Sequence, residues 1–300
     1  MSNNHSHSTN GGHSDDNTLE KDFSNSQYLN KDTTPENALH RIRTAGSISI
    51  SPELFEKIYL SPQNKVAGEL RKTVGNPTPV ALVGFLLSLT PLSCILIGWR
   101  GAGGSGASDT AAYFFFGGIL MILGGIGEFL IGNTFPCVVF TSFGAFWLTY
   151  GGTLQPFFNA YGAYSTTGVV ADGLTTKGFN ASFAFFMLWM GVLCLLYSIL
   201  ALRTNIVFFL ILFLLVPAFC CLAGVFWHTA EGNAAEAAKL LKAAGGITLA
   251  IDLLGWYILT AVMLAAVDFP FVIPVGDLST IVKGASEKAK AKAEREEFGE

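Results

Sequence analysis

Six long apolar windows restrict what this sequence can fold into. They cover residues 78–99, 111–132, 137–158, 180–202, 205–228 and 245–267. Each has about the 20 residues that a helix needs to cross a hydrocarbon core of about 30 Å. Four contain no Asp, Glu, Lys or Arg, whereas the second holds only Glu128 and the sixth only Asp252. Because the windows lack the alternation of barrel strands, helices are the structure that satisfies the backbone in lipid. The sequence predicts an all-α membrane protein with six transmembrane helices and both termini on the same side.

The charged residues divide the chain into segments. Only twelve Asp, Glu, Lys and Arg residues lie between Asn76 and Asp268, and the rest lie in the two ends. We expect a disordered polar tail over 1–50, an amphipathic pre-membrane segment over 51–75, the membrane domain over 76–268 and a charged tail over 269–300. The net charge of −4 and the absence of a basic aromatic patch argue against nucleic-acid binding.

The orientation in the membrane follows from two weaker signals. Near the spans, Lys65, Arg71, Lys72, Arg203 and Lys283 lie on the side of the termini, against Arg100, Lys177, Lys239 and Lys242 on the other side. Five basic residues against four is a small positive-inside bias. No secretory signal peptide precedes the first window, which also favours a cytoplasmic N-terminus. We therefore expect a multi-pass plasma-membrane protein with cytoplasmic termini.

The sequence shows no arrangement typical of an enzyme or a metal site. The five cysteines lie inside apolar windows without the spacing of metal ligands, and we expect no disulfide framework, metal or cofactor. No nucleophile–base pair and no cofactor-binding loop is visible, so we expect a protein that is not an enzyme.

The second window repeats its glycines at seven-residue spacing. Seven residues are nearly two helical turns, so the repeated glycines line one helix face and permit close packing within or between subunits. This packing face comprises Gly117, Gly118, Gly124, Gly125 and Gly132.

Two carboxylates within the windows are candidates for proton coupling. Ionisable groups in membrane helices normally face protein or water. Glu128 lies near a helix end, where anchoring at the membrane interface is a strong competing explanation. Asp252 lies deeper, where a structural hydrogen bond to a neighbouring helix is the alternative to proton exchange.

The stretch GNPTPVALVGF (75–85) marks the start of the first window. Pro is tolerated in a first helical turn because those positions lack intrahelical N–H partners. Asn76 is a good N-cap, and the positive end of the helix dipole favours a carboxylate there. From these residues alone, Asn76, Pro77, Thr78 and Pro79 form either a sharp helix start or the entry for an anion.

Three stretches together resemble the acetate uptake transporter family. NPTPVALVGF resembles its NPAPLGL-x-x-F signature, GNTFPCVVFTSFGAFWLTYG (132–151) is similar to its GNTFG stretch, and ALRTNIVFF (201–209) is similar to the turn between the fourth and fifth helices of fungal members. The likeness covers residues 50–267. This sequence departs from the signature at Thr78, Val80 and Ala81.

The resemblance implies a pore through six helices, a hexameric homo-oligomer, and passage of acetate or other short monocarboxylates. It places an apolar constriction at Phe85, at Phe143 where the family has Tyr, and near Ile211 or Leu212. We therefore expect a proton-coupled transporter of short monocarboxylates in a lipid membrane. The alternatives are export of ammonia or ammonium, which the naming of fungal members implies, and a non-transporting membrane sensor of acetate stress.

Overall fold

Long helices make up most of the described chain. The computed structural model describes residues 74–279, 281–282, 284–285 and 288, together with the two short strands 28–29 and 49–50. The strands β1 (Tyr28–Leu29) and β2 (Ser49–Ile50) pair in parallel. The rest of the predicted 1–50 tail, nearly all of the predicted 51–75 segment and most of the end of the 269–300 tail lie outside the described residues.

The principal helices follow the predicted windows. They are α4 (Thr78–Ile97), α5 (Thr110–Ala112), the π-helix η3 (Tyr113–Leu120), α6 (Met121–Leu130), α7 (Thr134–Thr153), α8 (Lys177–Ala201), α9 (Ile206–Ala230) and α10 (Ala234–Ala266). Short 3-10 turns fill the connections: η1 (Trp99–Gly101), η2 (Gly104–Asp109), η4 (Pro156–Phe158), η5 (Gly162–Tyr164) and η6 (Val170–Thr175).

Five helices in the described part of the chain are long and apolar enough to cross a membrane. They span Thr78–Ile97, Gly104–Leu130, Lys177–Ala201, Ile206–Ala230 and Ala234–Ala266. The helix α7 occupies the remaining predicted window, but its Thr, Ser, Gly, Trp and Tyr residues lower its hydropathy. The chain is thus a predominantly helical membrane protein.

The helix α4 has a defined start and end. Pro77 takes the N-cap position, and Pro79 lies in the first turn, where a missing N–H costs no hydrogen bond. At the other end Gly98 adopts φ +83°, and its N–H donates to the carbonyls of Cys94 and Ile95. A left-handed glycine is a common helix stop because it carries no Cβ. These two ends fix the length of α4 within the bundle.

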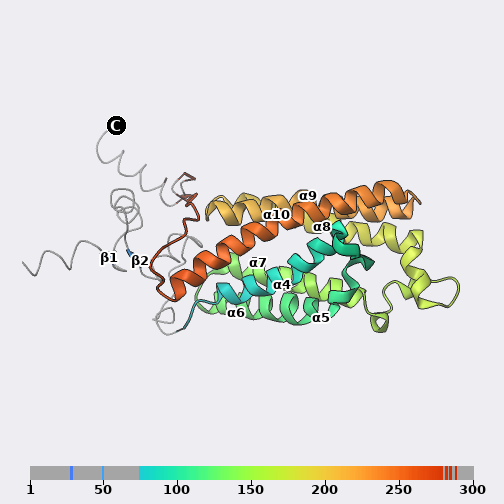
Figure 1. The fold of residues 1–300 in the computed structure, drawn as a ribbon, viewed down its shortest axis with the longest axis horizontal. Helices are drawn as coiled ribbons and strands as arrows, with labels where there is room; N and C mark the ends of the chain where they lie inside the picture. The colour runs from blue at the N-terminus through green and yellow to red at the C-terminus, as the bar shows by residue number, and fades with distance from the viewer. Residues whose placement is uncertain are drawn as a thin grey trace, which may run out of the picture.

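The helices lie side by side along the long axis of the molecule (Figure 1). The helix α8 packs on α9, α9 on α10, α10 on α4, and α4 on η3 and α6, which in turn pack on α7. Aromatic contacts close the circle, since Phe146 of α7 lies against Phe186 of α8 and Phe219 of α9. The described helices therefore surround a common centre.

The outer surface of the bundle is strongly apolar. On η3 and α6 the exposed side chains include Phe115, Leu123 and Phe129, and on α8 they include Trp189 and Leu196. Large apolar side chains exposed on several helices are expected where lipid or another membrane-embedded surface covers them.

The chain after α10 folds back onto the bundle. Val275 is buried in the core, and Asn205 forms an antiparallel bridge with Asp277. The N–H of Ile206 donates to the carbonyl of Gly276 at 2.9 Å. This segment lies at the end of the molecule where α10 finishes, opposite the connection between α7 and α8 (Figure 1).

Candidate functional site

The predicted entry forms a tight turn at the start of α4. The side-chain oxygen Oδ1 of Asn76 accepts from the N–H of Thr78 at 2.9 Å. This bond satisfies one of the N–H groups that a helix start leaves without an intrahelical partner. Because Pro77 is the N-cap residue, Asn76 stabilises the turn from one position earlier than the sequence predicts.

A buried carboxylate of the protein lies beside this turn. Glu128, near the end of α6, has an exposed fraction of 0%. The hydroxyl of Thr78 donates to Glu128 Oε1, and Asn133 Nδ2 donates to Glu128 Oε2 at 2.7 Å. Glu128 thereby ties the starts of α4 and α7 to the end of α6. The Thr78 hydroxyl at the predicted entry is thus hydrogen-bonded to a carboxylate of the chain itself.

The glycines of the second window allow α6 and η3 to approach their neighbours closely. A Cβ on Gly124 would lie 2.7 Å from Ala81 Cβ of α4, and one on Gly117 would lie 2.4 Å from the Trp147 ring of α7. On the adjoining face, Gly118 meets Leu148 and Gly125 meets Thr141, both on α7. Gly132 lies past the end of α6 with φ +84°. These contacts lie within one subunit.

A narrow cavity of about 30 Å³ lies at the centre of the circle of helices. Phe85 of α4 and Phe143 of α7, the two motif positions, both line it. On α9 the cavity is lined by Leu215, Ala218, Phe219 and Leu222, whereas Ile211 and Leu212 are buried outside its lining. About 10–15 Å³ is enough for one water molecule, so the cavity is only slightly larger than the smallest solutes. Its walls are almost entirely apolar.

A larger cavity of about 680 Å³ shares part of its lining with the narrow one. Four residues line both: Leu92, Leu96, Phe146 and Leu222. Polar groups join its wall at Tyr150, Asn180 and Thr229. No sequence pattern predicts this cavity, because its lining comes from segments that are far apart in the chain. Because the two cavities share these four residues, they are adjacent.

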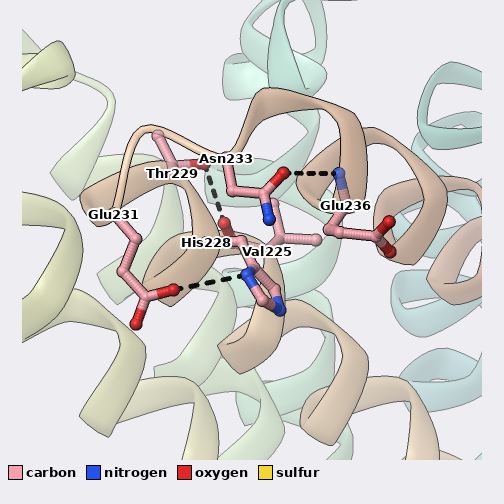
Figure 2. A network of polar contacts seen from close by, with 6 residues as sticks. All are labelled: Val225, His228, Thr229, Glu231, Asn233 and Glu236. Carbon is pink, nitrogen blue, oxygen red and sulfur yellow. Dashed lines mark hydrogen bonds and ion pairs between the residues drawn. The ribbon is translucent and has the colours of Figure 1, made fainter.

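The turn between α9 and α10 carries a network of polar contacts (Figure 2), and Thr229 and Ala234 beside this turn line the larger cavity. His228 Nδ1 lies 3.5 Å from Glu231 Oε2, and the Thr229 hydroxyl donates to the carbonyl of Val225 at 2.7 Å. Asn233 Oδ1 accepts from the N–H of Glu236 at 3.3 Å and caps α10. The turn next to the larger cavity is therefore polar, in contrast to the walls of the narrow cavity.

Asp252 is buried at the contact of α10 with α4. Its exposed fraction is 1%, and Asp252 Oδ2 lies 2.6 Å from Ser93 Oγ. Ser93 Oγ also lies 2.9 Å from the Thr248 hydroxyl, and Thr248 is the polar residue that lines the narrow cavity. The Thr90 side chain of α4 also interacts with the Asp252 carboxylate. Sequence reasoning named Asp252 but missed Thr248, which precedes it by one helical turn on the same face.

Among the described residues, no group of three or more His, Cys, Asp or Glu side chains is arranged to hold a metal ion. The five cysteines are free.

Comparison with known proteins identifies the family. Residues 59–280 match the model of the GPR1/FUN34/yaaH family. "Protein alcS" of Aspergillus fumigatus is 46% identical over 234 residues, which are 78% of this chain and 86% of that protein. "Acetate transporter protein patA" of Aspergillus clavatus is 30% identical over 212 residues, 69% and 80% of the two chains.

Two further proteins broaden the comparison. "Ammonia transport outward protein 3" of Saccharomyces cerevisiae is 30% identical over 182 residues, 61% of this chain and 60% of that protein. Among solved structures, the bacterial acetate channel SatP matches with a TM-score of 0.50 and 27% identity, over 68% of this chain and 99% of the channel. The matches support the resemblance from sequence motifs, and the chain belongs to the GPR1/FUN34/yaaH family.

Proposed function

We propose that this protein transports acetate and related short monocarboxylates across the plasma membrane. The observation that carries the proposal is the narrow apolar cavity lined by Phe85 and Phe143, which shares its lining with the larger cavity. Relatives named as an acetate transporter and an acetate channel support the choice of solute. In this proposal α7 is the sixth transmembrane helix, and both termini are cytoplasmic.

The proposed path runs from the turn at Asn76–Pro79 to the larger cavity. The turn at the start of α4 is then the mouth on the cytoplasmic side, and the constriction formed by Phe85, Phe143 and Leu215 separates it from the larger cavity. The larger cavity, whose aromatic and polar walls have room for hydrated solutes, is the mouth on the other side. Leu215 takes the third position of the constriction in place of Ile211 or Leu212, because it lines the cavity and they do not.

The negative charge of acetate must be neutralised for the solute to cross an apolar constriction at low cost. Moving an ionised carboxylate out of water without a partner costs far more than burying a neutral group. The neutral acid passes such a wall at a much lower cost, which makes transport proton-coupled. We assign this coupling to Asp252, which is connected through Ser93 to Thr248 at the wall of the narrow cavity. We do not assign it to Glu128, which holds three helix ends together.

We also propose a homo-oligomer, as the family resemblance implies, with six subunits. The glycine face of the second window is used for packing within the subunit. The exposed apolar side chains of η3, α6 and α8 are then the surfaces that meet lipid or neighbouring subunits.

Uptake of labelled acetate by cells that lack other acetate carriers tests the function and the path. We expect uptake above that of cells without the protein, and altered uptake when Phe85 or Phe143 is replaced by Ala. A matched control is Val138→Ala, because Val138 lies on α7 but faces outward. Uptake that is indifferent to Phe85→Ala, Phe143→Ala and Asn76→Ala alike would rule out the assigned path.

Ammonia export is the second candidate function. It is favoured by the wholly apolar contact that Phe143 offers where the family has Tyr, because neutral ammonia needs no charge compensation there. The relative named as an ammonia transport outward protein gives it further support. Parallel measurement of acetate and ammonia flux in liposomes that contain the purified protein distinguishes the two, since ammonia flux alone would replace the first proposal.

A further inference from the structure

We infer that Thr248 and Ser93 form a proton relay between the narrow cavity and Asp252. This inference rests on the proposed transport of short monocarboxylates and assigns two further residues to it. The relay gives a proton to the carboxylate of the solute inside the cavity, so that the neutral acid passes the apolar constriction.

Two short contacts join the side-chain oxygen atoms of Thr248, Ser93 and Asp252 in series. The Thr248 hydroxyl is at the wall of the narrow cavity and lies 2.9 Å from Ser93 Oγ. Ser93 Oγ lies 2.6 Å from Asp252 Oδ2. All three residues are at least nine-tenths buried, with exposed fractions of 3%, 0% and 1% in that order. Distances of 2.6–2.9 Å are those of good hydrogen bonds between oxygen atoms, which is the geometry that proton transfer requires.

A count of hydrogen atoms shows that this line is suited to hold a proton. Ser93 Oγ contacts the carbonyl of Leu89 at 2.9 Å as well as Thr248 and Asp252. Thr248 Oγ1 contacts the carbonyl of Gly245 at 3.0 Å. Each hydroxyl has one hydrogen to donate, so two hydroxyls cannot supply all four contacts. A proton on Asp252 Oδ2, donated to Ser93, supplies one more.

The transfer balances without any other reactant. The Asp252 Oδ2–H bond breaks as Ser93 Oγ takes the proton, Ser93 passes its own proton to Thr248 Oγ1, and Thr248 passes its own to the acetate oxygen. The products are acetic acid in the cavity, the Asp252 carboxylate and two restored hydroxyls. A hydronium ion that reaches the narrow cavity gives a proton to Thr248, and the reverse sequence restores the proton on Asp252 and leaves water.

No other charged group competes for this proton within the described bundle. The helix α4 carries Cys94 as its one titratable side chain, and α9 carries Cys220, Cys221 and His228. On α10 itself, Glu236, Lys239 and Lys242 lie in the first turns and Tyr257 donates to the carbonyl of Pro274. None of these side chains forms a hydrogen bond or ion pair with Asp252. Apart from Ser93, the polar side chain that interacts with the Asp252 carboxylate is the uncharged Thr90 of α4.

The test compares Thr248→Val, which removes the hydroxyl with little change of shape, with Thr248→Ser, which keeps it. The full-length protein is placed in liposomes, and labelled-acetate flux above that of protein-free liposomes is measured at alkaline and at acidic pH. At alkaline pH acetate must take its proton from Asp252, whereas at acidic pH the acid arrives with its own. Thr260→Val, on the same helix with a hydroxyl bonded to its own backbone, is the control.

We expect Thr248→Val to lose most of its flux at alkaline pH and to approach wild type at acidic pH, with Thr248→Ser close to wild type at both. Equal flux of the Val and Ser variants at both pH values overturns the relay, and so does an equal loss at both, which indicates a structural role only. Ser93→Ala gives the same readout if Thr248→Val does not fold. Absence of acetate flux in the wild-type protein overturns the proposed function itself.

Discussion

Substitution of Thr78 by Val tests the link between the start of α4 and the buried carboxylate of Glu128. Thr78 has an exposed fraction of 4%, and its hydroxyl donates to Glu128 Oε1. Val has nearly the same shape but no hydroxyl, so the change removes one hydrogen bond without leaving a large cavity. Asn133 Nδ2 still donates to Glu128 Oε2 in the variant.

The expected loss of stability follows from the measured contributions of two classes of hydrogen bond. Bonds to charged groups contribute about 1.5–3 kcal/mol in proteins, while bonds between membrane helices average about 0.6 kcal/mol. Because Glu128 is fully buried, the loss of one partner leaves its oxygen without compensation from water. We expect Thr78→Val to lower the free energy of unfolding by about 1–2 kcal/mol.

The assay is the thermal or denaturant midpoint of the purified protein in detergent, with Thr149→Val as the matched control. Thr149 lies on α7 with an exposed hydroxyl that bonds the carbonyl of Ala145 in its own helix. The control is expected to change stability by a few tenths of a kcal/mol, the range of a surface substitution. If both variants unfold at the same midpoint as the wild type, Glu128 does not hold the helix ends together.

Three further changes follow from the packing of the bundle. Gly124→Ala is expected to destabilise the protein by about 1–3 kcal/mol, because the added Cβ would lie 2.7 Å from Ala81 Cβ. Gly246→Ala is expected to be neutral or stabilising, because no atom lies within 4 Å of the added Cβ. The thermal midpoints of the two purified variants test both expectations. Tyr257→Phe removes the 2.6 Å hydrogen bond to the Pro274 carbonyl, and we expect faster proteolysis after α10 with unchanged bundle stability. Phe143→Tyr restores a hydroxyl at the narrow cavity and is expected to raise the ratio of acetate to ammonia flux in liposomes, while an unchanged ratio would show that this position does not select the solute.

Hydrophobic windows were sufficient to locate the helices but not all of their ends. The window predicted at 205–228 corresponds to α9 at Ile206–Ala230. By contrast, α10 begins at Ala234, well before the predicted start at 245, because its first turns contain Glu236, Lys239 and Lys242 among alanines. Charges lower hydropathy without preventing helix formation, since Ala, Glu and Lys are all good helix formers.

The site was predictable where a motif carried it and not where it depends on packing between distant helices. The motif positions Phe85 and Phe143 line the same cavity. Leu215, which we propose as the third position, lines the cavity because of the rotation of α9 about its axis, which no local pattern records. Likewise, the contact of Ser93 with Asp252 joins residues 159 positions apart, so the sequence identified the buried carboxylate but not its partners.

Acetate flux through Phe143→Trp tests the central proposal most directly. The narrow cavity measures about 30 Å³, so the additional ring atoms of Trp would fill the space between Phe85 and Leu215 and block the proposed path. Val138→Trp places the same ring on the outward face of α7 and serves as the control. In liposomes containing equal amounts of folded protein, we expect Phe143→Trp to reduce labelled-acetate flux to that of protein-free liposomes and Val138→Trp to retain wild-type flux. Wild-type flux through Phe143→Trp would contradict a path through this cavity.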